Sequence, residues 1–532
     1  MKTRQLKALE RLSRKTVSPD EIISREQARG LTTLSTELNR QLALLIHRSG
    51  KIEVVIVGDF NRIVIPVLTN IRTAGGRLRG LRCVHTTLTG SGVSEEDIMD
   101  MVCLRLDLIS VLTIQDDLPD KLHTVHLLPS KKEGRGWLEL PSVHPAARQQ
   151  SCIELIEAVE TEFVRLRPTI DVDKGRDRAL LVSVTTGSRA MAEESLSELA
   201  ELAHSAGVLV LDTVIQRRRK IHPRFILGRG KLMEIMLTSL RLDANLLLFD
   251  QELSPSQVRS VTDHTDLRVI DRTQLILDIF AGRAKSREGK LQIEMAQLKY
   301  MLPKLSTRDD ALSRLTGGIG ARGPGETRLE IDRRRINDRI ARLAKELKAV
   351  GRQRYHRRHQ RRRRDVPVIS LVGYTNAGKS TLLNTLTASD IQAEDLLFAT
   401  LDPTSRRLRF PRDREVIITD TVGFIRNLPV ELLKAFASTL EELQEADLLL
   451  HVIDISCPSW REKKAVVEDL LRRLHLERIT CLRVYNKIDR VQEGHGNLPV
   501  DDEGVLISAT DSKTLSPLLE RAELLLRRSA LL

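Results

Sequence analysis

GYTNAGKS, residues 373–380, is the stretch that decides the fold of this chain. An apolar run at 366–372 precedes it, and a helix-compatible run follows from Thr381. A glycine-rich turn between a strand and a helix, closed by Lys-Ser, is typical of a phosphate-binding P-loop. Its backbone can approach phosphates closely, and Lys379 is expected to neutralise the β and γ oxygens. The hydroxyl of Ser380 is the expected Mg²⁺ ligand.

Three further motifs follow in an order typical of guanine-nucleotide binding. DTVG at 420–423 ends an apolar run, so its aspartate should face the metal and its glycine amide should approach a γ-phosphate. NKID at 486–489 and SAT at 508–510 end two more apolar runs. A carboxylate accepts hydrogen bonds from N1 and the exocyclic amino group of guanine, whereas adenine has no donors in those places. Asn486 and Asp489 therefore predict GTP rather than ATP.

In this order and context, the four motifs predict a Ras-like GTPase domain in which Lys379 and Gly423 act on the γ-phosphate. The second protein ligand of the metal should come from the loop before Leu408, where Thr400 and Thr404 both carry a hydroxyl. The residues of the four motifs expected to contact the nucleotide are Gly373, Tyr374, Thr375, Asn376, Ala377, Gly378, Lys379, Ser380, Asp420, Thr421, Val422, Gly423, Asn486, Lys487, Ile488, Asp489, Ser508, Ala509 and Thr510.

Phe424 stands where many Ras-like enzymes carry a glutamine that orients the attacking water. An apolar side chain cannot polarise water, so we expect slow intrinsic hydrolysis, with the missing stabilisation supplied by an ion, another loop or a partner. The alternative is that Phe424 only packs beneath the switch. Asn376 offers an amide oxygen that could hold a potassium ion beside the phosphates, or its amide could simply brace the P-loop.

The composition limits the possible partners. The 532 residues suffice for three or four domains, and a net charge of +13 favours a polyanionic partner. Aromatic residues are only 3% of the chain, so folded nucleic acid fits better than recognition dominated by base stacking. Five cysteines without paired spacing favour a reducing compartment. Neither a signal peptide nor an apolar run of about 18 residues is present. We expect a cytoplasmic monomer without a membrane span.

Two apolar stripes with helical spacing flank a glycine-rich segment and predict an antiparallel helical hairpin. The segment is TGGIGARGPGETR, residues 316–328, and a basic run at 352–364 follows the second stripe. Five glycines allow close approach to another backbone, and Arg322 and Arg328 favour RNA over a plain connector. The stripes are Leu291, Met295, Leu298 and Leu302, and then Ile336, Ile340, Leu343, Leu347 and Val350.

Apolar runs alternate with helix-compatible stretches between Ala179 and Asp271, which predicts a small α/β domain with a parallel sheet. SPSQ is expected to open one of its helices. GRGK at 228–231 could cradle a phosphate at a helix start, but it lacks a full fingerprint, and a cap with a turn fits it better.

These residues together resemble the HflX family of translational GTPases over roughly residues 179–510. The segments that carry the resemblance are PRFILGRGK, FDQELSPSQVR, VIDRTQLILDIFAGRAKSREGKLQIEMAQLKY, GGIGARGPGETRLEIDRRR, LVGYTNAGKSTLLNTLT, FATLDPTSR and DTVGF. The resemblance implies binding to the large ribosomal subunit, a hairpin loop that reaches ribosomal RNA, and separation of subunits on stalled or idle ribosomes. FATLD is similar to the first switch of Obg- and HflX-type GTPases, which favours Thr400 as catalytic residue and metal ligand. The switch residues expected near the nucleotide are Phe398, Ala399, Thr400, Leu401 and Asp402.

The chain departs from the family pattern at both ends. Many members carry a further domain after the GTPase domain, whereas only residues 511–532 follow SAT here. KIEVVIVGD and LRGLRCVHTTLTGSGVSEEDIMDM, near the start, are weakly similar to JAB/MPN-type metalloprotease domains. His85 and Asp97 match that metal site, but Thr87 replaces its second histidine, so we expect a module for contact or stability without catalysis.

The expected architecture is a multidomain α/β chain with a Ras-like P-loop domain. We assign residues 1–175 to the extra α/β module, 176–272 to the family's N-terminal α/β domain, 273–365 to the hairpin with its basic run, and 366–532 to the GTPase domain. The expected function is GTP hydrolysis coupled to splitting or rescue of ribosomes. The alternative is a GTPase that assembles ribosomes or another RNA–protein complex without splitting.

Overall fold

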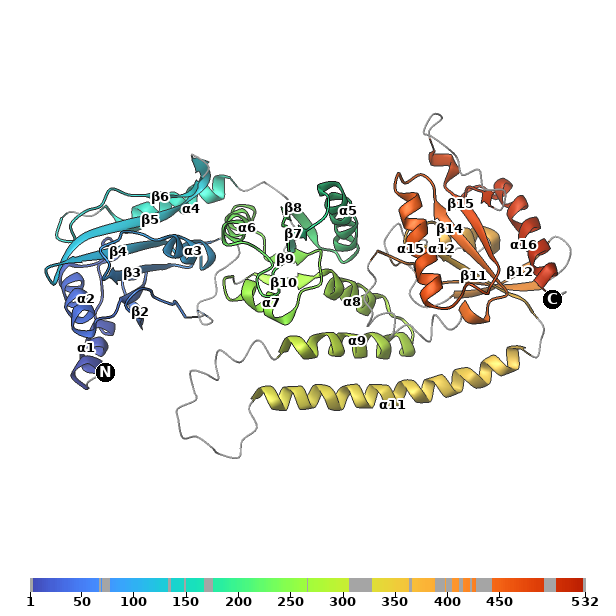
Figure 1. Cartoon of the computed structure of the whole chain (residues 1–532), viewed down its shortest axis with the longest axis horizontal. Helices are drawn as coiled ribbons and strands as arrows, with labels where there is room; N and C mark the ends of the chain where they lie inside the picture. The colour runs from blue at the N-terminus through green and yellow to red at the C-terminus, as the bar shows by residue number, and fades with distance from the viewer. Residues whose placement is uncertain are drawn as a thin grey trace. The chain divides into compact units, whose positions relative to one another are not determined.

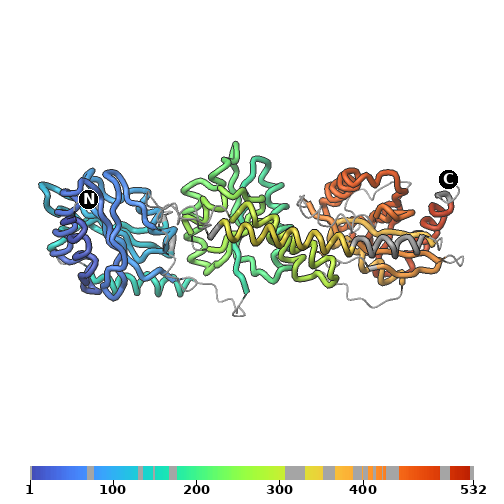
Figure 2. The backbone as a smooth tube through the Cα atoms, turned by 90° about the horizontal axis from the view of Figure 1, so that it is seen from below, coloured from blue at the N-terminus to red at the C-terminus, as the bar shows by residue number. Residues whose placement is uncertain are grey.

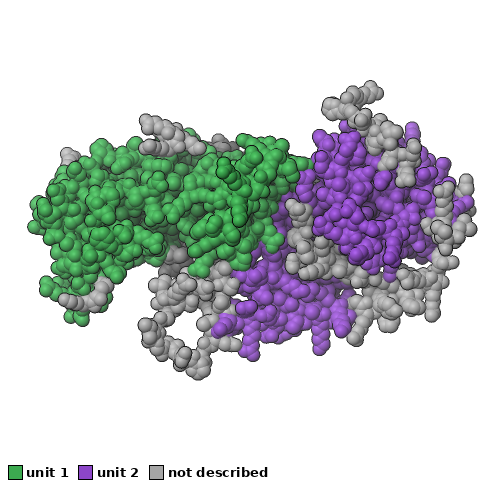
Figure 3. Space-filling model, viewed as in Figure 1, with its two compact units in different colours: residues 1–200, 207–271 green, residues 201–206, 272–532 purple. Residues whose placement is uncertain are grey.

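The computed structural model describes most of the chain as two compact units, one of residues 1–200 and 207–271 and the other of residues 201–206 and 272–532 (Figure 3). The residues described are 3–66, 68, 77–132, 135–147, 150–166, 176–265, 267–305, 328–362, 366–387, 398, 404–410, 415–421, 423–426, 443–491 and 504–529. They form three β-sheets (Figure 1). Among these residues, no helix combines the length and the apolar character needed to cross a membrane.

The first unit begins with a mixed sheet in the order β2-β1-β3-β4-β5-β6. β3 pairs parallel with β4, and the other described pairs of this sheet are antiparallel. β1 is buried on both faces, so the sheet is covered on both sides at that strand. The elements are α1 (Thr3–Ser13), α2 (Arg25–Leu38), β1 (Leu42–His47), β2 (Ile52–Val57), β3 (Leu81–Thr87), α3 (Glu95–Cys103), β4 (Leu108–Gln115), β5 (Leu118–Lys132), β6 (Arg135–Glu139) and α4 (Cys152–Arg165).

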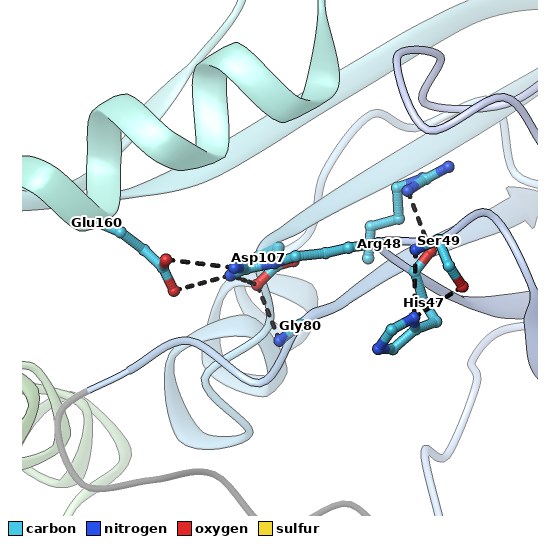
Figure 4. A network of polar contacts seen from close by, with 7 residues as sticks. His47, Arg48, Ser49, Gly80, Asp107 and Glu160 are labelled. Atoms are coloured by element: carbon cyan, nitrogen blue, oxygen red, sulfur yellow. Dashed lines mark hydrogen bonds and ion pairs between the residues drawn. The ribbon is translucent and has the colours of Figure 1, made fainter.

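A partly buried ion-pair network ties α4 to this sheet (Figure 4). Arg48, just after β1, donates to Asp107 Oδ2 at 2.7 Å and to Glu160 Oε1 on α4 at 2.8 Å. The amide of Gly80 donates to Asp107 Oδ1 at 3.1 Å. Burial raises the pKa of Asp107, and the hydrogen bond from Arg48 opposes that rise. Arg48 therefore compensates a carboxylate that would otherwise be costly to bury.

The second sheet of the first unit confirms the predicted parallel α/β arrangement, in the order β10-β9-β7-β8. As expected, the Ser254 hydroxyl caps α7, and Gln257 completes a capping box. GRGK also behaves as a cap and turn, because Gly228 is the N-cap of α6. The elements are β7 (Arg178–Thr185), α5 (Arg189–Ser205), β8 (Leu209–Arg217), α6 (Arg229–Leu242), β9 (Leu246–Phe249), α7 (Pro255–Thr262) and β10 (Arg268–Asp271).

The second unit contains the two long helices expected for the hairpin, α9 (Arg287–Leu305) and α11 (Arg328–Arg362), preceded by α8 (Arg272–Arg283). α9 and α11 lie side by side (Figure 1, Figure 2). Arg287 pairs with Glu346 and Arg339 pairs with Glu294, a register that only antiparallel helices produce. Leu343, in the middle of the second predicted stripe, is fully buried. Most of the predicted glycine-rich loop lies outside the described residues.

The third sheet has the order β12-β13-β11-β14-β15-β16 and is parallel except for the β12–β13 pair. Because its parallel strands end at one edge, residues at the ends of β11, β13 and β15 meet there. The elements are β11 (Val368–Gly373), α12 (Lys379–Thr387), β12 (Thr404–Arg409), β13 (Glu415–Asp420), η1 (Leu443–Glu445), β14 (Leu448–Asp454), α15 (Trp460–Arg473), β15 (Cys481–Asn486), η2 (Ile488–Arg490), β16 (Val505–Leu506), η3 (Ser512–Leu515) and α16 (Ser516–Ser529).

Candidate nucleotide-binding site

The P-loop joins β11 to α12, as its sequence predicts. Gly378 has φ +91°, and a Cβ at this position would overlap the Asn486 amide nitrogen. Glycine is therefore needed both for the backbone conformation and for the close approach. Asn376 also has a left-handed backbone, with φ +60°, and its side chain is exposed. The turn thus leads directly into the first turn of α12, whose backbone amides favour an anion such as a phosphate.

Lys379 is buried at the base of the loop. Its Nζ donates to Tyr374 O at 2.8 Å and to Gly373 O at 3.2 Å. Burial lowers the pKa of Lys379 to about 8, and the charge of Asp420 partly offsets that effect. Gly423 belongs to the same site, because a Cβ on it would lie 3.0 Å from Lys379 Nζ. The ammonium and the Gly423 backbone therefore converge on one small volume, as expected for a γ-phosphate site.

The residues at the predicted metal position fit Mg²⁺. Ser380 Oγ donates to Asp420 Oδ2 at 2.7 Å, so a hydroxyl and a carboxylate oxygen meet beside the P-loop. Mg²⁺ prefers such hard oxygen ligands and is usually bound through one or two protein groups together with substrate phosphates. Thr421, next in the chain, points away from this position, because its hydroxyl donates to Leu371 O at 2.6 Å.

Phe424 packs into the domain. Its side chain is 2% exposed, and its backbone pairs with the P-loop. Thr375 N donates to Phe424 O at 2.7 Å, and Phe424 N donates to Gly373 O at 3.1 Å. The packing role left open by the sequence is therefore observed. Slow intrinsic hydrolysis, expected because a phenylalanine ring cannot polarise water, stays a prediction.

At the base-binding end, Asn486 and Asp489 have different surroundings. Asn486 is 1% exposed, its Nδ2 donates to Ala377 O at 2.8 Å, and its Oδ1 accepts from Ala509 N at 2.9 Å. Its amide therefore braces the P-loop against the SAT loop, and its role in base selection together with Asp489 stays a prediction. Asp489 is exposed and has its carboxylate available to a guanine.

Lys487 and the SAT loop are held by side chains that the motifs did not indicate. Lys487 Nζ forms a 2.8 Å ion pair with Asp454 Oδ2, at the end of β14. Thr385 Oγ1 on α12 donates to Ala509 O at 2.6 Å. Ser508 and Thr510 join their hydroxyls at 2.9 Å. Asp454 could have been found from the sequence, because it is an acidic residue at the end of the apolar run that precedes the NKID strand.

Of the five residues predicted near the nucleotide in the first switch, the structure describes Phe398. Its side chain is 2% exposed and packs against Phe280 of α8, with ring centroids 4.5 Å apart, and its contact with the nucleotide stays a prediction. Its apolar ring gains more from this aromatic contact than from exposure beside phosphates. The other predicted switch residues, Ala399, Thr400, Leu401 and Asp402, lie outside the described residues, as does Val422 of DTVG.

The two residues of the N-terminal module that match a metal site lie close together. His85 Nε2 and Asp97 Oδ1 are 2.9 Å apart, so the structure brings the two predicted residues together. Thr87 bonds Thr89 through their hydroxyls at 3.0 Å. Among the described residues, no group of three His, Cys, Asp or Glu side chains could hold a metal ion. His85 and Asp97 form a partly buried polar pair that joins β3 to α3.

Comparison with known proteins identifies the family. Residues 193–281 match the family described as GTP-binding GTPase N-terminal, 283–361 match GTP-binding GTPase Middle Region, and 368–487 match 50S ribosome-binding GTPase. A solved GTP-binding protein from Sulfolobus solfataricus, in complex with GDP, shares 24% identity over 66% of this chain and 99% of its own, with a TM-score of 0.37.

Two curated relatives carry the assignment. GTPase HflX of Lacrimispora saccharolytica is 48% identical over 67% of this chain and 85% of its own length. GTPase HflX of Caldanaerobacter subterraneus is 47% identical over 66% of this chain and 81% of its own length. Both matches cover most of the relative's length, and both relatives are GTPases, in agreement with the P-loop site described above. The chain belongs to the HflX family of GTPases.

Proposed function

We propose that this GTPase binds the large ribosomal subunit through ribosomal RNA and uses its GTP cycle to separate the subunits of stalled or idle ribosomes. The observation that carries the proposal is the match of residues 368–487 to the family described as 50S ribosome-binding GTPase. The hairpin supports it. Between residues 330 and 350, α11 carries seven Lys or Arg against four Asp or Glu, and most of these cations are exposed. Such a surface favours a phosphate backbone.

The proposal assigns a role to each part of the chain. Residues 366–532 bind and hydrolyse GTP, residues 273–365 place the hairpin against RNA, and residues 176–272 support the hairpin. Residues 1–175 form the additional module, which serves contact or stability. We propose that the protein acts in the cytoplasm as a monomer.

The metal chemistry is part of the proposal. Ser380 and Thr400 would hold Mg²⁺, which neutralises charge on the β and γ phosphates during transfer. Asn376 would add a potassium ion through its amide oxygen, and the exposure of this side chain supports that role. Lys379 and the Gly423 amide act directly on the γ-phosphate. Since Phe424 offers no polar group to the attacking water, the ribosome should supply much of the activation.

Sedimentation of intact ribosomes after incubation with the protein tests this function. With GTP or a non-hydrolysable analogue, we expect the ribosome peak to decrease and free subunits to appear. Subunit binding without this change would instead support the ribosome-assembly alternative. Absence of any co-sedimentation with ribosomes or large subunits would refute the proposal.

A loop variant locates the working element. Gly317, Gly318 and Gly320 lie outside the described residues, and replacing all three with alanine should abolish splitting because added side chains block close approach to RNA. GTP binding should remain, since the nucleotide site is built from other residues. Gly282→Ala is the matched control, because a Cβ there meets no atom within 4 Å. Unchanged splitting by the triple variant would contradict this role of the loop.

A further inference from the structure

The loop between β8 and α6 presents an aromatic ring to solvent within a basic segment. Phe225 is 46% exposed, although large apolar side chains are usually buried. Residues 217–231 contain seven Arg or Lys and no Asp or Glu. The cationic residues are Arg217, Arg218, Arg219, Lys220, Arg224, Arg229 and Lys231.

Two cationic or polar side chains border the Phe225 ring. The Arg224 guanidinium lies 5.2 Å from the ring centroid, within cation–π distance. The His222 ring is 5.4 Å away and tilted by 36°. His222 Nδ1 accepts from the amides of Arg224 and Phe225, at 3.1 and 3.2 Å. Its Nε2 is therefore the nitrogen left to interact with a ligand.

Hydrogen bonds from the start of α7 and from Arg218 fix the backbone of this loop. Gln257 Nε2, in the first turn of α7, donates to His222 O at 3.1 Å. The hydroxyls of Ser254 and Ser256 both donate to Pro223 O, at 3.3 and 3.2 Å. Arg218 Nη1 donates to Phe225 O at 3.1 Å. The backbone around the exposed ring is thus fixed by hydrogen bonds, which preorganises it for a partner.

Part of the positive charge of this segment is not neutralised by acidic side chains. Arg229 pairs with Glu96 at 3.3 Å and Lys231 pairs with Glu234 at 3.0 Å. In the part of the chain that the structure describes, Arg217, Arg219 and Lys220 have no such ion pair, and all three are exposed. The cations without an acidic partner therefore lie in the same segment as Phe225, residues 217–225.

We propose that residues 217–225 form a contact surface for an unpaired RNA nucleotide, with a base stacked on Phe225 and adjacent phosphates bound by Arg217, Arg219 and Lys220. A flat aromatic face among cations suits a nucleobase joined to phosphates, and unpaired RNA bases are commonly recognised in this way. An acidic peptide would satisfy the cations but would leave the ring without a stacking partner. One ring serves one nucleotide, which agrees with the low aromatic content of the chain.

This inference rests on the proposed function for the identity of the RNA, which would be ribosomal, but the loop can be tested without ribosomes. Fluorescence anisotropy of the full-length protein with a labelled single-stranded RNA of roughly 10 nucleotides measures the contact directly. Phe225→Ala should weaken binding about tenfold, and Phe225→Trp should restore it. Met191→Ala is the matched control, since Met191 is an equally prominent apolar side chain of the same unit, 61% exposed. A thermal unfolding curve confirms that each variant is folded.

The salt dependence separates stacking from charge. Arg219→Gln should reduce the slope of log affinity against log salt by about 0.7, because one phosphate contact is lost. Phe225→Ala should leave that slope unchanged, since a stacked base releases no counterion. A duplex of the same sequence should show no effect of Phe225→Ala, because its bases are not accessible to the ring.

Several results would overturn the inference. Wild-type affinity in Phe225→Ala, or an equal loss on single-stranded and duplex RNA, would exclude base stacking. Binding of polyglutamate instead of RNA, with Phe225→Ala equal to wild type, would assign the cations to a protein partner. If large subunits bind the wild type and Phe225→Ala equally, and the oligonucleotide also binds both equally, only the proposal for this loop fails. If large subunits bind neither the wild type nor Phe225→Ala, while the variant still binds the oligonucleotide more weakly, only the proposed ribosomal function fails.

Discussion

Raising the pH through about 8 should weaken GTP binding through Lys379. Burial lowers the pKa of this lysine to about 8, with a smaller opposing effect from Asp420. Only the ammonium neutralises phosphate oxygens, so a protein that has lost this proton must regain it to bind. Relative to its value well below pH 8, the dissociation constant of GTP is then larger by a factor of about 1.1 at pH 7 and about 4 at pH 8.5. The affinity should therefore fall roughly fourfold between these conditions, which corresponds to about 0.8 kcal/mol.

Isothermal titration calorimetry in two buffers of different ionisation enthalpy measures both parts of this prediction. At pH 8.5 the binding of GTP should take up about 0.8 proton per site, and almost none at pH 7. This pH lies below the range in which N1 of guanine loses its own proton. Lys379→Arg is the control, because a guanidinium remains charged throughout and should make the affinity independent of pH. A flat profile without proton uptake in the wild type would refute the reasoning.

The stability of the nucleotide-free protein should change in the opposite direction. The pKa of Lys379 in the folded protein lies below the ordinary value of 10.5, so the folded protein binds fewer protons than the unfolded chain between these values. Its contribution to the free energy of unfolding therefore increases from about pH 8 to 10.5 and is lost as the pH falls through about 8. Weaker binding with unchanged or higher stability distinguishes this titration from alkaline unfolding.

Four substitutions test other parts of the structure. Asp489→Asn should weaken GTP binding by about 2–3 kcal/mol, because an acceptor that is buried in the complex becomes mispaired. A GTP affinity within about threefold of wild type would contradict guanine selection by this carboxylate. Gly378→Ala should abolish nucleotide binding in a titration with fluorescent GDP, since its Cβ would overlap the NKID asparagine and its φ is +91°. Arg48→Ala should destabilise the first unit by about 3 kcal/mol in denaturant unfolding, because Asp107 remains buried without its partner, whereas GTP hydrolysis should not change. Asn376→Ala should remove the faster hydrolysis expected in potassium over sodium at equal ionic strength and leave GTP binding nearly unchanged, and equal rates of the wild type in both salts would exclude the ion.

The sequence alone determined the elements that depend on local chemistry. The P-loop requires a particular run of glycines, a lysine and a hydroxyl between a strand and a helix, so eight consecutive residues were enough to locate it. The stripes that include Leu291 and Leu343 predicted the helical hairpin, because a period near 3.6 buries one face of a helix. Ser254 and Gln257 likewise predicted the start of α7, since a capping box forms within a single turn.

The tertiary structure alone decided the contacts between residues that are far apart in the chain. Asn486 braces Ala377 across 109 positions, and Arg48 reaches Glu160 across 112. No local pattern encodes such pairs, because they depend on how strands are ordered and how helices pack across a sheet. The same reason applies to Phe398, because its contact with Phe280 joins two segments that are far apart in the chain. The composition gives the number of aromatic residues. Only the folded chain shows that the Phe225 ring is exposed and lies beside Arg224.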